Sequence, residues 1–172
     1  SGTSSIVLTG TVANINTFLT GSAPVFAPSA NFNGAVTLTM VTNDGGNTGG
    51  AALSDTDTST ITVNSVNDAP INTLPGTFSV NEDTNLTLTG LSISDVDAGT
   101  GDVTVTLSVN SGTLSASSSG NVTVNNSGTS SIVLTGTVAN INTFLTGFAP
   151  VFAPSANFNG AVTLTMVTND GG

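Results

Sequence analysis

Ten carboxylates are the only ionisable side chains in this 172-residue chain, and they gather in a few short segments. Three lie in the segment SDVDAGTGD, three flank NDGGNTGGAALSDTD, two share NED, one lies in VNDAP, and one repeats an earlier position. In that order they are Asp95, Asp97 and Asp102; Asp44, Asp55 and Asp57; Glu82 and Asp83; Asp68; and Asp170. The Asp-x-Asp spacing in a glycine-rich loop lets two carboxylates turn toward one point.

Calcium is the cation that this pattern favours. Ca²⁺ binds about six to eight hard oxygens in a flexible cage, which loop carboxylates and carbonyls supply, whereas Mg²⁺ demands a stricter octahedron and keeps its waters. Carboxylates held close together repel unless a cation lies between them. The chain has no cationic side chain, so this cation must come from solution. The alternative is that Asp and Asn serve as turn residues and the charge keeps the protein soluble.

The missing residue types exclude most other chemistry. The chain has no Lys, Arg, His or Cys, and its formal net charge is −10. Nucleic-acid binding needs cations that displace phosphate counterions, so we expect no nucleic-acid partner. A serine nucleophile would have no His or Lys to activate it. Without such activation we expect no enzyme. No apolar run is long enough for a membrane span, so we also expect no direct membrane insertion.

Short alternating runs predict the strands that position these loops. Examples are SIVLTG (5–10), AVTLTMVT (35–42), STITVNSV (59–66), NLTLTGLSI (85–93) and DVTVTLSV (102–109). Alternation in the last run places Val103, Val105 and Leu107 on one face and polar residues on the other. Many short strands separated by turn residues predict an all-β fold, an antiparallel β-sandwich.

One segment per copy departs from the two-residue period. In TGTVANINTFLTG the apolar residues Val12, Ile15, Phe18 and Leu19 follow helical spacing. Thr11 can cap the start of a helix and Gly21 its end. We therefore predict one short helix at about 12–19, repeated at about 138–145. The alternative, a further strand, remains open for such a short apolar run.

The chain repeats itself. Residues 127–172 match residues 1–46 at every position but one, where Phe148 replaces Ser22, so the period is 126 residues. Pro70 in VNDAP blocks a ladder hydrogen bond, which places a repeat start near Asn67. We therefore interpret 1–66 as the later part of one repeat, and 67–172 as the following repeat without its last strand.

Three motifs at these spacings resemble bacterial cadherin-like tandem repeats. They are VNDAP at 66–70, NEDTNLTLTGLSISDVDAG at 81–99 and FNGAVTLTMVTNDGGNTG at 32–49. Such repeats occur in giant secreted adhesins and biofilm matrix proteins. The resemblance implies Ig-like sandwiches in a row, export to the cell surface or extracellular matrix of a bacterium, and calcium at the junctions between repeats.

The resemblance also implies where each ligand lies. One set should meet at a junction: Asn67, Asp68, Asp95, Asp97, Asp102 and Asp170. A second set should belong to sites completed by absent or neighbouring repeats: Glu82, Asp83, Asp44, Asp55 and Asp57. Within this set, Glu82 should face the next repeat, and the hairpin acids should lie at the far end of the first unit.

These expectations define a structural module of a long extracellular fibre or adhesin stalk, stiffened by calcium. Half a sandwich leaves open sheet edges, so we expect neighbouring repeats or copies of the chain to fill them. Strand exchange between chains is the simplest form, in which residues 59–66 of one chain complete the 67–172 unit of another. The alternative function is glycan or ice binding through an exposed threonine face, built from the pairs Thr37/Thr39, Thr87/Thr89 and Thr104/Thr106.

Overall fold

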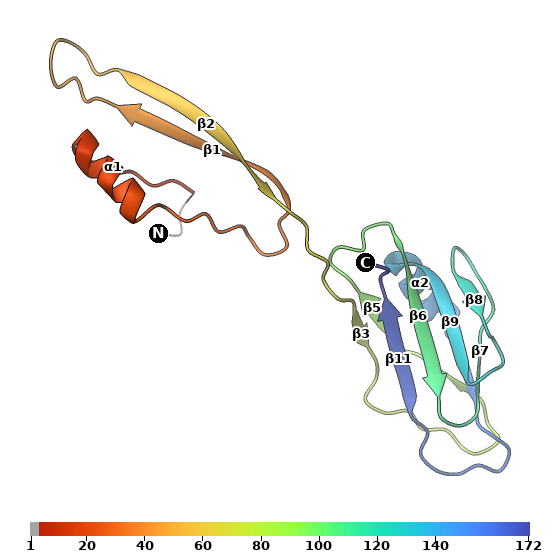
Figure 1. The fold of residues 1–172 in the computed structure, drawn as a ribbon. Helices are drawn as coiled ribbons and strands as arrows, with labels where there is room; N and C mark the ends of the chain where they lie inside the picture. Colours follow the sequence, from red (N-terminus) through yellow and green to blue (C-terminus); the bar gives the residue numbers. More distant parts are fainter. Residues whose placement is uncertain (1–3) are drawn as a thin grey trace. The chain divides into compact units, whose positions relative to one another are not determined.

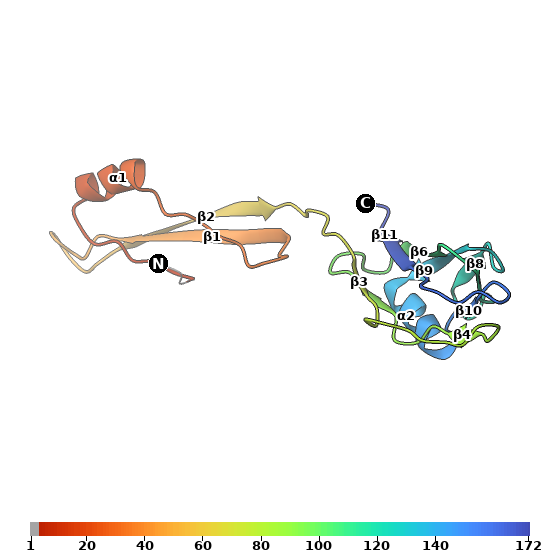
Figure 2. The same ribbon diagram turned by 90° about the horizontal axis from the view of Figure 1, so that it is seen from below.

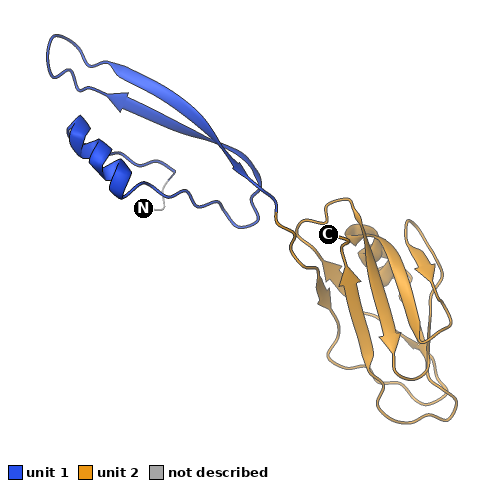
Figure 3. Cartoon of the chain, viewed as in Figure 1, with its two compact units in different colours: residues 1–65 blue, residues 66–172 orange. Residues whose placement is uncertain are grey.

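The computed structural model describes residues 4–172, and the chain divides into two compact units, residues 1–65 and 66–172 (Figure 3). Unit 1 contains α1 (Val12–Gly21), β1 (Gly34–Asn43) and β2 (Ser54–Val63) (Figure 1). Unit 2 contains, in chain order, β3 (Ile71–Thr73), β4 (Leu86–Thr87), β5 (Ser92–Ser94), β6 (Asp102–Val109), β7 (Thr113–Ser115), β8 (Thr123–Asn125), β9 (Ser131–Thr137), α2 (Val138–Gly147), β10 (Val151–Ala153) and β11 (Leu164–Asn169).

Unit 1 is a helix and a long hairpin. The side chain of Thr11 caps α1 by accepting a hydrogen bond from the Asn14 backbone N–H at 3.3 Å. Strands β1 and β2 pair antiparallel over their whole lengths, from Gly34 opposite Val63 to Asn43 opposite Ser54. No residue in the described part of this unit is buried. Backbone pairing and local capping therefore hold unit 1 without an interior.

Unit 2 is built from antiparallel sheets with a shared core. The strand orders are β11-β6-β9-β8, β4-β10-β7 and β3-β5. Figure 2 shows β11, β6, β9 and β8 on one side of the unit and β4 and β10 on the other. Burial alternates along β6, where Val103, Val105 and Leu107 point into the core as their spacing predicts.

The core of unit 2 is one cluster of apolar side chains drawn from its sheets and from α2. The helix contributes Ile141, Phe144 and Leu145. The strands and loops contribute Leu88, Leu91, Ile93, Val103, Val105, Leu107, Val109, Leu114, Val122, Ile132, Leu134, Phe152 and Met166. At about 25 cal/mol per Å² of apolar surface removed from water, this cluster is the main stabilising term of the unit.

The repeated sequence has two different environments. In unit 2 it forms β9, α2, β10 and β11 around the core, whereas in unit 1 the same residues cover nothing. The exposed fractions of three side-chain pairs show the contrast: 37% for Leu8 and 0% for Leu134, 44% for Phe18 and 2% for Phe144, and 54% for Met40 and 8% for Met166. The difference comes from residues 67–126, which form the rest of unit 2 and have no counterpart in unit 1.

The fold confirms an all-β chain with two short helices, at Val12–Gly21 and Val138–Gly147, and the structure places no helix within 85–109. Three strand predictions need correction. Residues 5–10 form no strand, because only the copy, β9, has β6 and β8 to pair with. The run 85–93 is broken into β4 and β5 around Gly90, whose φ of 79° suits a turn. The run 59–66 belongs to β2, which begins at Ser54 and ends at Val63.

Candidate metal site

The loop from β5 to β6 carries Asp95 and Asp97. Asp95 Oδ1 accepts hydrogen bonds from the backbone N–H groups of Asp97 at 3.1 Å and Ala98 at 3.0 Å. These bonds fold the loop back on itself, and Gly101 N–H closes it on Ala98 O at 2.9 Å. The second oxygen, Asp95 Oδ2, is buried and has no hydrogen-bond partner among the described residues. A buried, unsatisfied carboxylate oxygen is costly, so it suits a cation.

The segment that opens unit 2 is held between two acidic side chains. The backbone N–H of Asp68 donates to Asp97 Oδ2 at 2.9 Å. The side-chain amide of Asn67 donates to Asp170 Oδ2 at 2.8 Å. Four of the six residues expected at a junction are therefore linked in pairs at one end of unit 2.

The remaining two residues of this set differ in their involvement. Asp95 joins the group through the loop bonds to Asp97. Asp102 begins β6 opposite Thr137, and its side chain is exposed. The arrangement thus favours Asp95 and Asp97 as the centre of a candidate site, with the backbone of Asp68 bound beside them.

Asp170 and its copy Asp44 share one local turn but have different long-range partners. The Asn67 amide, with help from Gly172 N–H, lowers the pKa of Asp170. The backbone N–H groups of Gly46 and Leu53 lower the pKa of Asp44. A carboxylate whose pKa is lowered in the folded state stabilises the fold at pH values above its ordinary pKa of 3.8. This contribution is lost as acid protonates the carboxylate. The Asn67–Asp170 contact should therefore weaken in acid.

Three of the other predicted ligands belong to the hairpin of unit 1. Asp55 and Asp57 stand opposite Thr42 and Met40 in the hairpin of unit 1, near the loop that follows Asp44. These three acids lie at the loop end of that hairpin, away from Val63.

Glu82 and Asp83 lie between β3 and β4. Asp83 Oδ1 accepts a hydrogen bond from the Asn157 backbone N–H at 2.8 Å, and Asp83 has a positive φ of 60°. Asn157 precedes β11, whereas Asp170 follows it. The contact between Asp83 and Asn157 therefore lies at the opposite end of β11 from Asp170. Glu82 borders an apolar cavity of unit 2.

The donor chemistry at the Asp95 loop fits Ca²⁺. All the available donors are hard oxygens, and one of them is buried and unpartnered. Within residues 4–172 no three acidic side chains stand close enough together to form a complete cage. An ion here would therefore need backbone carbonyls, water or a neighbouring molecule to complete its coordination.

Two of the three threonine pairs lie on strands, whereas Thr89 follows β4 and is in no strand. Thr104 and Thr106 alternate with the buried valines of β6, and Thr37 and Thr39 lie on the exposed hairpin. This placement fits a solvated sheet face as well as a ligand surface, so threonine-based binding stays a prediction.

Comparison with known proteins adds no assignment. No family model, curated protein or solved structure matches the chain. In the part of the chain that the structure describes, neither helix is long enough to cross a membrane.

Proposed function

We propose that the chain is a structural module of a long bacterial surface fibre or adhesin stalk, made of cadherin-like β-sandwich repeats. One observation carries the proposal: a 46-residue sequence occurs twice, covered in one copy and uncovered in the other. Near-identical units suit a spacer, which needs length and stiffness, better than a specific binding site, which needs one copy. Secretion and assembly with neighbouring repeats or copies belong to the same proposal.

Unit 2 supports the sandwich interpretation. Its core draws side chains from sheets on both sides, with Val105 and Leu134 from the four-stranded sheet and Leu114 and Phe152 from the three-stranded sheet. Helix α2 packs beside β5 and β9 and closes part of the interior. Two antiparallel sheets with a core between them are the architecture of cadherin-like repeats.

Calcium is the proposed stiffener. An ion held by Asp95 together with Asp97 would satisfy the buried Asp95 Oδ2 and cancel repulsion between these two carboxylates. The loop before β6 and the segment before β3 already share the Asp68–Asp97 hydrogen bond. Calcium would tie these two segments more firmly, fixing the start of one repeat.

We expect millimolar calcium to raise the melting temperature of unit 2. For a site with a dissociation constant near 0.1 mM, 10 mM Ca²⁺ stabilises by about 2.7 kcal/mol. Asp95→Asn should abolish the response, because it removes one charge while keeping a carbonyl oxygen for the loop hydrogen bonds. Calorimetry with Ca²⁺, with Mg²⁺ and with a chelator measures the shift.

Asp57→Asn is the matched control. It removes the same charge from an exposed position in the hairpin of unit 1 and should keep the full calcium response of unit 2. If the wild-type chain melts at the same temperature in calcium and in chelator, calcium stiffening is wrong. The same conclusion follows if both variants respond equally.

A further inference from the structure

Among the described residues, one edge of β11 pairs with no strand, although β3 lies against it through Asn72. In the four-stranded sheet β11 is terminal, with β6 on its other side. The Met166 carbonyl accepts a hydrogen bond from the Asn72 side-chain amide at 3.0 Å, so it points away from β6. Backbone groups alternate between the two edges of a strand. The N–H and C=O groups of Leu164, Met166 and Thr168 therefore face the unpaired edge.

In unit 1 the same edge of the same sequence is paired. Residues 38–43 of β1 repeat residues 164–169 of β11. The bond from Asp44 N–H to Leu53 O identifies a hydrogen-bonded pair at the end of the hairpin. Alternation from that pair makes Met40 and Asp57 a hydrogen-bonded pair as well. Strand β2 thus occupies on β1 the edge that is unpaired on β11.

The lengths of the two strands point to the same missing partner. Strand β1 begins at Gly34, but β11 begins only at Leu164, although Gly160 is the copy of Gly34. Residues 34–37 are extended where β2 pairs with them, and their copies at 160–163 are not in a strand. A second strand on β11 would extend it in the same way.

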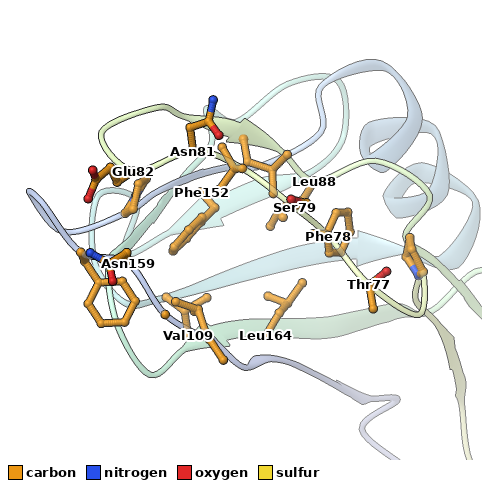
Figure 4. A pocket seen from close by; sticks show the side chains of 18 of the residues that line it. Thr77, Phe78, Ser79, Asn81, Glu82, Leu88, Val109, Phe152, Asn159 and Leu164 are labelled. Atoms are coloured by element: carbon orange, nitrogen blue, oxygen red, sulfur yellow. The ribbon is translucent and has the colours of Figure 1, made fainter.

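A cavity of about 500 Å³ opens beside this part of unit 2. Figure 4 shows Phe78, Val109, Phe152 and Leu164 around it, and Val162 and Gly160 also line it. In the hairpin, Ile61 lies opposite Val36 and Val63 lies opposite Gly34. Opposite residues share a face of a sheet. A β2 strand in this register on β11 would therefore place its Ile and Val beside Val162 and Gly160, at the cavity.

We propose that the unpaired edge of β11 and the adjoining cavity accept β2 (Ser54–Val63) from a second copy of this chain. The docked strand would take the register that it has on β1, with Thr56 opposite Val167 and Ile61 opposite Val162. The proposal deepens the proposed function by naming the partner and the strand that joins copies.

We expect strand exchange to be favourable, because the backbone pairing that β2 loses on β1 is nearly the same as the pairing that it gains on β11. Leaving β1 for β11 replaces a register by an identical one, since the receiving residues repeat those left behind. The gain is burial: Ile61 and Val63 are only half-buried in the hairpin, whereas apolar side chains such as Val162 and Leu164 line the cavity together with polar ones. Asn72 on β3 must first release both the Met166 carbonyl and the Thr168 hydroxyl, and β3 must move away from β11, so docking is slower than simple strand addition.

Disulfide trapping tests the register, because the chain has no cysteine of its own. Val41 and Thr56 are opposite each other in the hairpin, and by alternation they form a non-hydrogen-bonded pair, with Cα atoms about 4.5 Å apart. That spacing suits a disulfide. Full-length chains carrying Val167→Cys and Thr56→Cys are mixed and oxidised mildly. Mass spectrometry should find at least about tenfold more mixed dimer than in the control.

The control mixture pairs Val167→Cys with Thr62→Cys, which lies on the same face of β2 but six residues away. A second arm locks β2 onto its own β1 with an intrachain disulfide between Thr39→Cys and Thr58→Cys. The locked chain should lose the concentration-dependent dimer that the unlocked chain shows in sedimentation.

Equal yields in the two mixtures, or unlocked chains that stay monomeric at every concentration, overturn the proposal. Trapping that is equally strong in the locked chain also overturns it, since another segment would then occupy the edge. The calcium response of melting is measured on the same chains. It would persist if only strand exchange is wrong, so failure of this inference is distinguishable from failure of the proposed function.

Discussion

Phe144→Ala should lower the free energy of unfolding of unit 2 by about 3–5 kcal/mol, whereas Phe18→Ala should change stability by less than about 0.5 kcal/mol. The two phenylalanines stand in the same local sequence on α2 and α1. Phe144 is buried in the core, so its loss removes apolar contacts and leaves a cavity. Phe18 is exposed, and its loss leaves none.

Urea unfolding followed by circular dichroism measures both changes. Phe144 also stacks on Phe148, with ring centroids 6.1 Å apart, whereas Ser22 stands at the equivalent place in unit 1. Phe148→Ser separates that contribution, because it makes the two copies identical. Equal losses for Phe144→Ala and Phe18→Ala would show that both copies have the same environment and would contradict the fold.

Asn142→Ala should be the most damaging polar change, at about 2–4 kcal/mol of unit 2 stability. Its side-chain oxygen accepts a hydrogen bond from Ile93 N–H at 2.9 Å, and its amide donates to Ile93 O at 2.8 Å. The side chain thus ties α2 to the backbone of β5, beside the buried Ile93 side chain. Truncation leaves two backbone groups without their partner.

Asn16→Ala is the matched control, since Asn16 is the copy of Asn142 and is exposed. Alanine has the higher helix propensity, so this change should be neutral or slightly stabilising. Amide exchange at Ile93 gives a direct readout, because its N–H loses its acceptor in Asn142→Ala. Unchanged protection at Ile93 would show that the hydrogen-bond pair does not hold β5.

Local signals in the sequence predicted the helices well. Thr11 and Thr137 each accept a hydrogen bond from the third residue after them, and the two helices have the same length in both units. The capping residue and the apolar spacing act within one turn, so they work whether or not a core is present. The alternation of Val103, Val105 and Leu107 was equally informative, because it depends only on the period of a strand.

Partners that are distant in sequence were not predictable in the same way. The run at 5–10 has the same sequence as residues 131–136, yet only the latter form part of a strand. The two runs differ in whether β6 and β8 are present to pair with them, and no local pattern at 5–10 can reveal this. The same limit applies to the site: the Asp-x-Asp spacing singled out Asp95 and Asp97, but only the fold showed that Asp97 binds the Asp68 N–H.

The sequence repeat predicts a partner strand for β11, in line with the strand exchange expected from the sequence. Residues 54–63 follow the first copy and are strand-like, so a partner for the second copy of 38–43 could be inferred from the period. The cavity and the position of Asn72 could not be inferred, because they depend on how the sheets pack.

Hydrogen exchange in the two copies tests the central claim most directly. The claim is that the repeated 46-residue sequence is part of a module and acquires a core only when residues 67–126 cover it. Nuclear magnetic resonance of the dilute full chain resolves each copy. We expect amides in β9 and α2 to exchange at least about 10³-fold more slowly than their copies at 5–21, since only the former require opening of a core. Equal protection in the two copies would contradict the account.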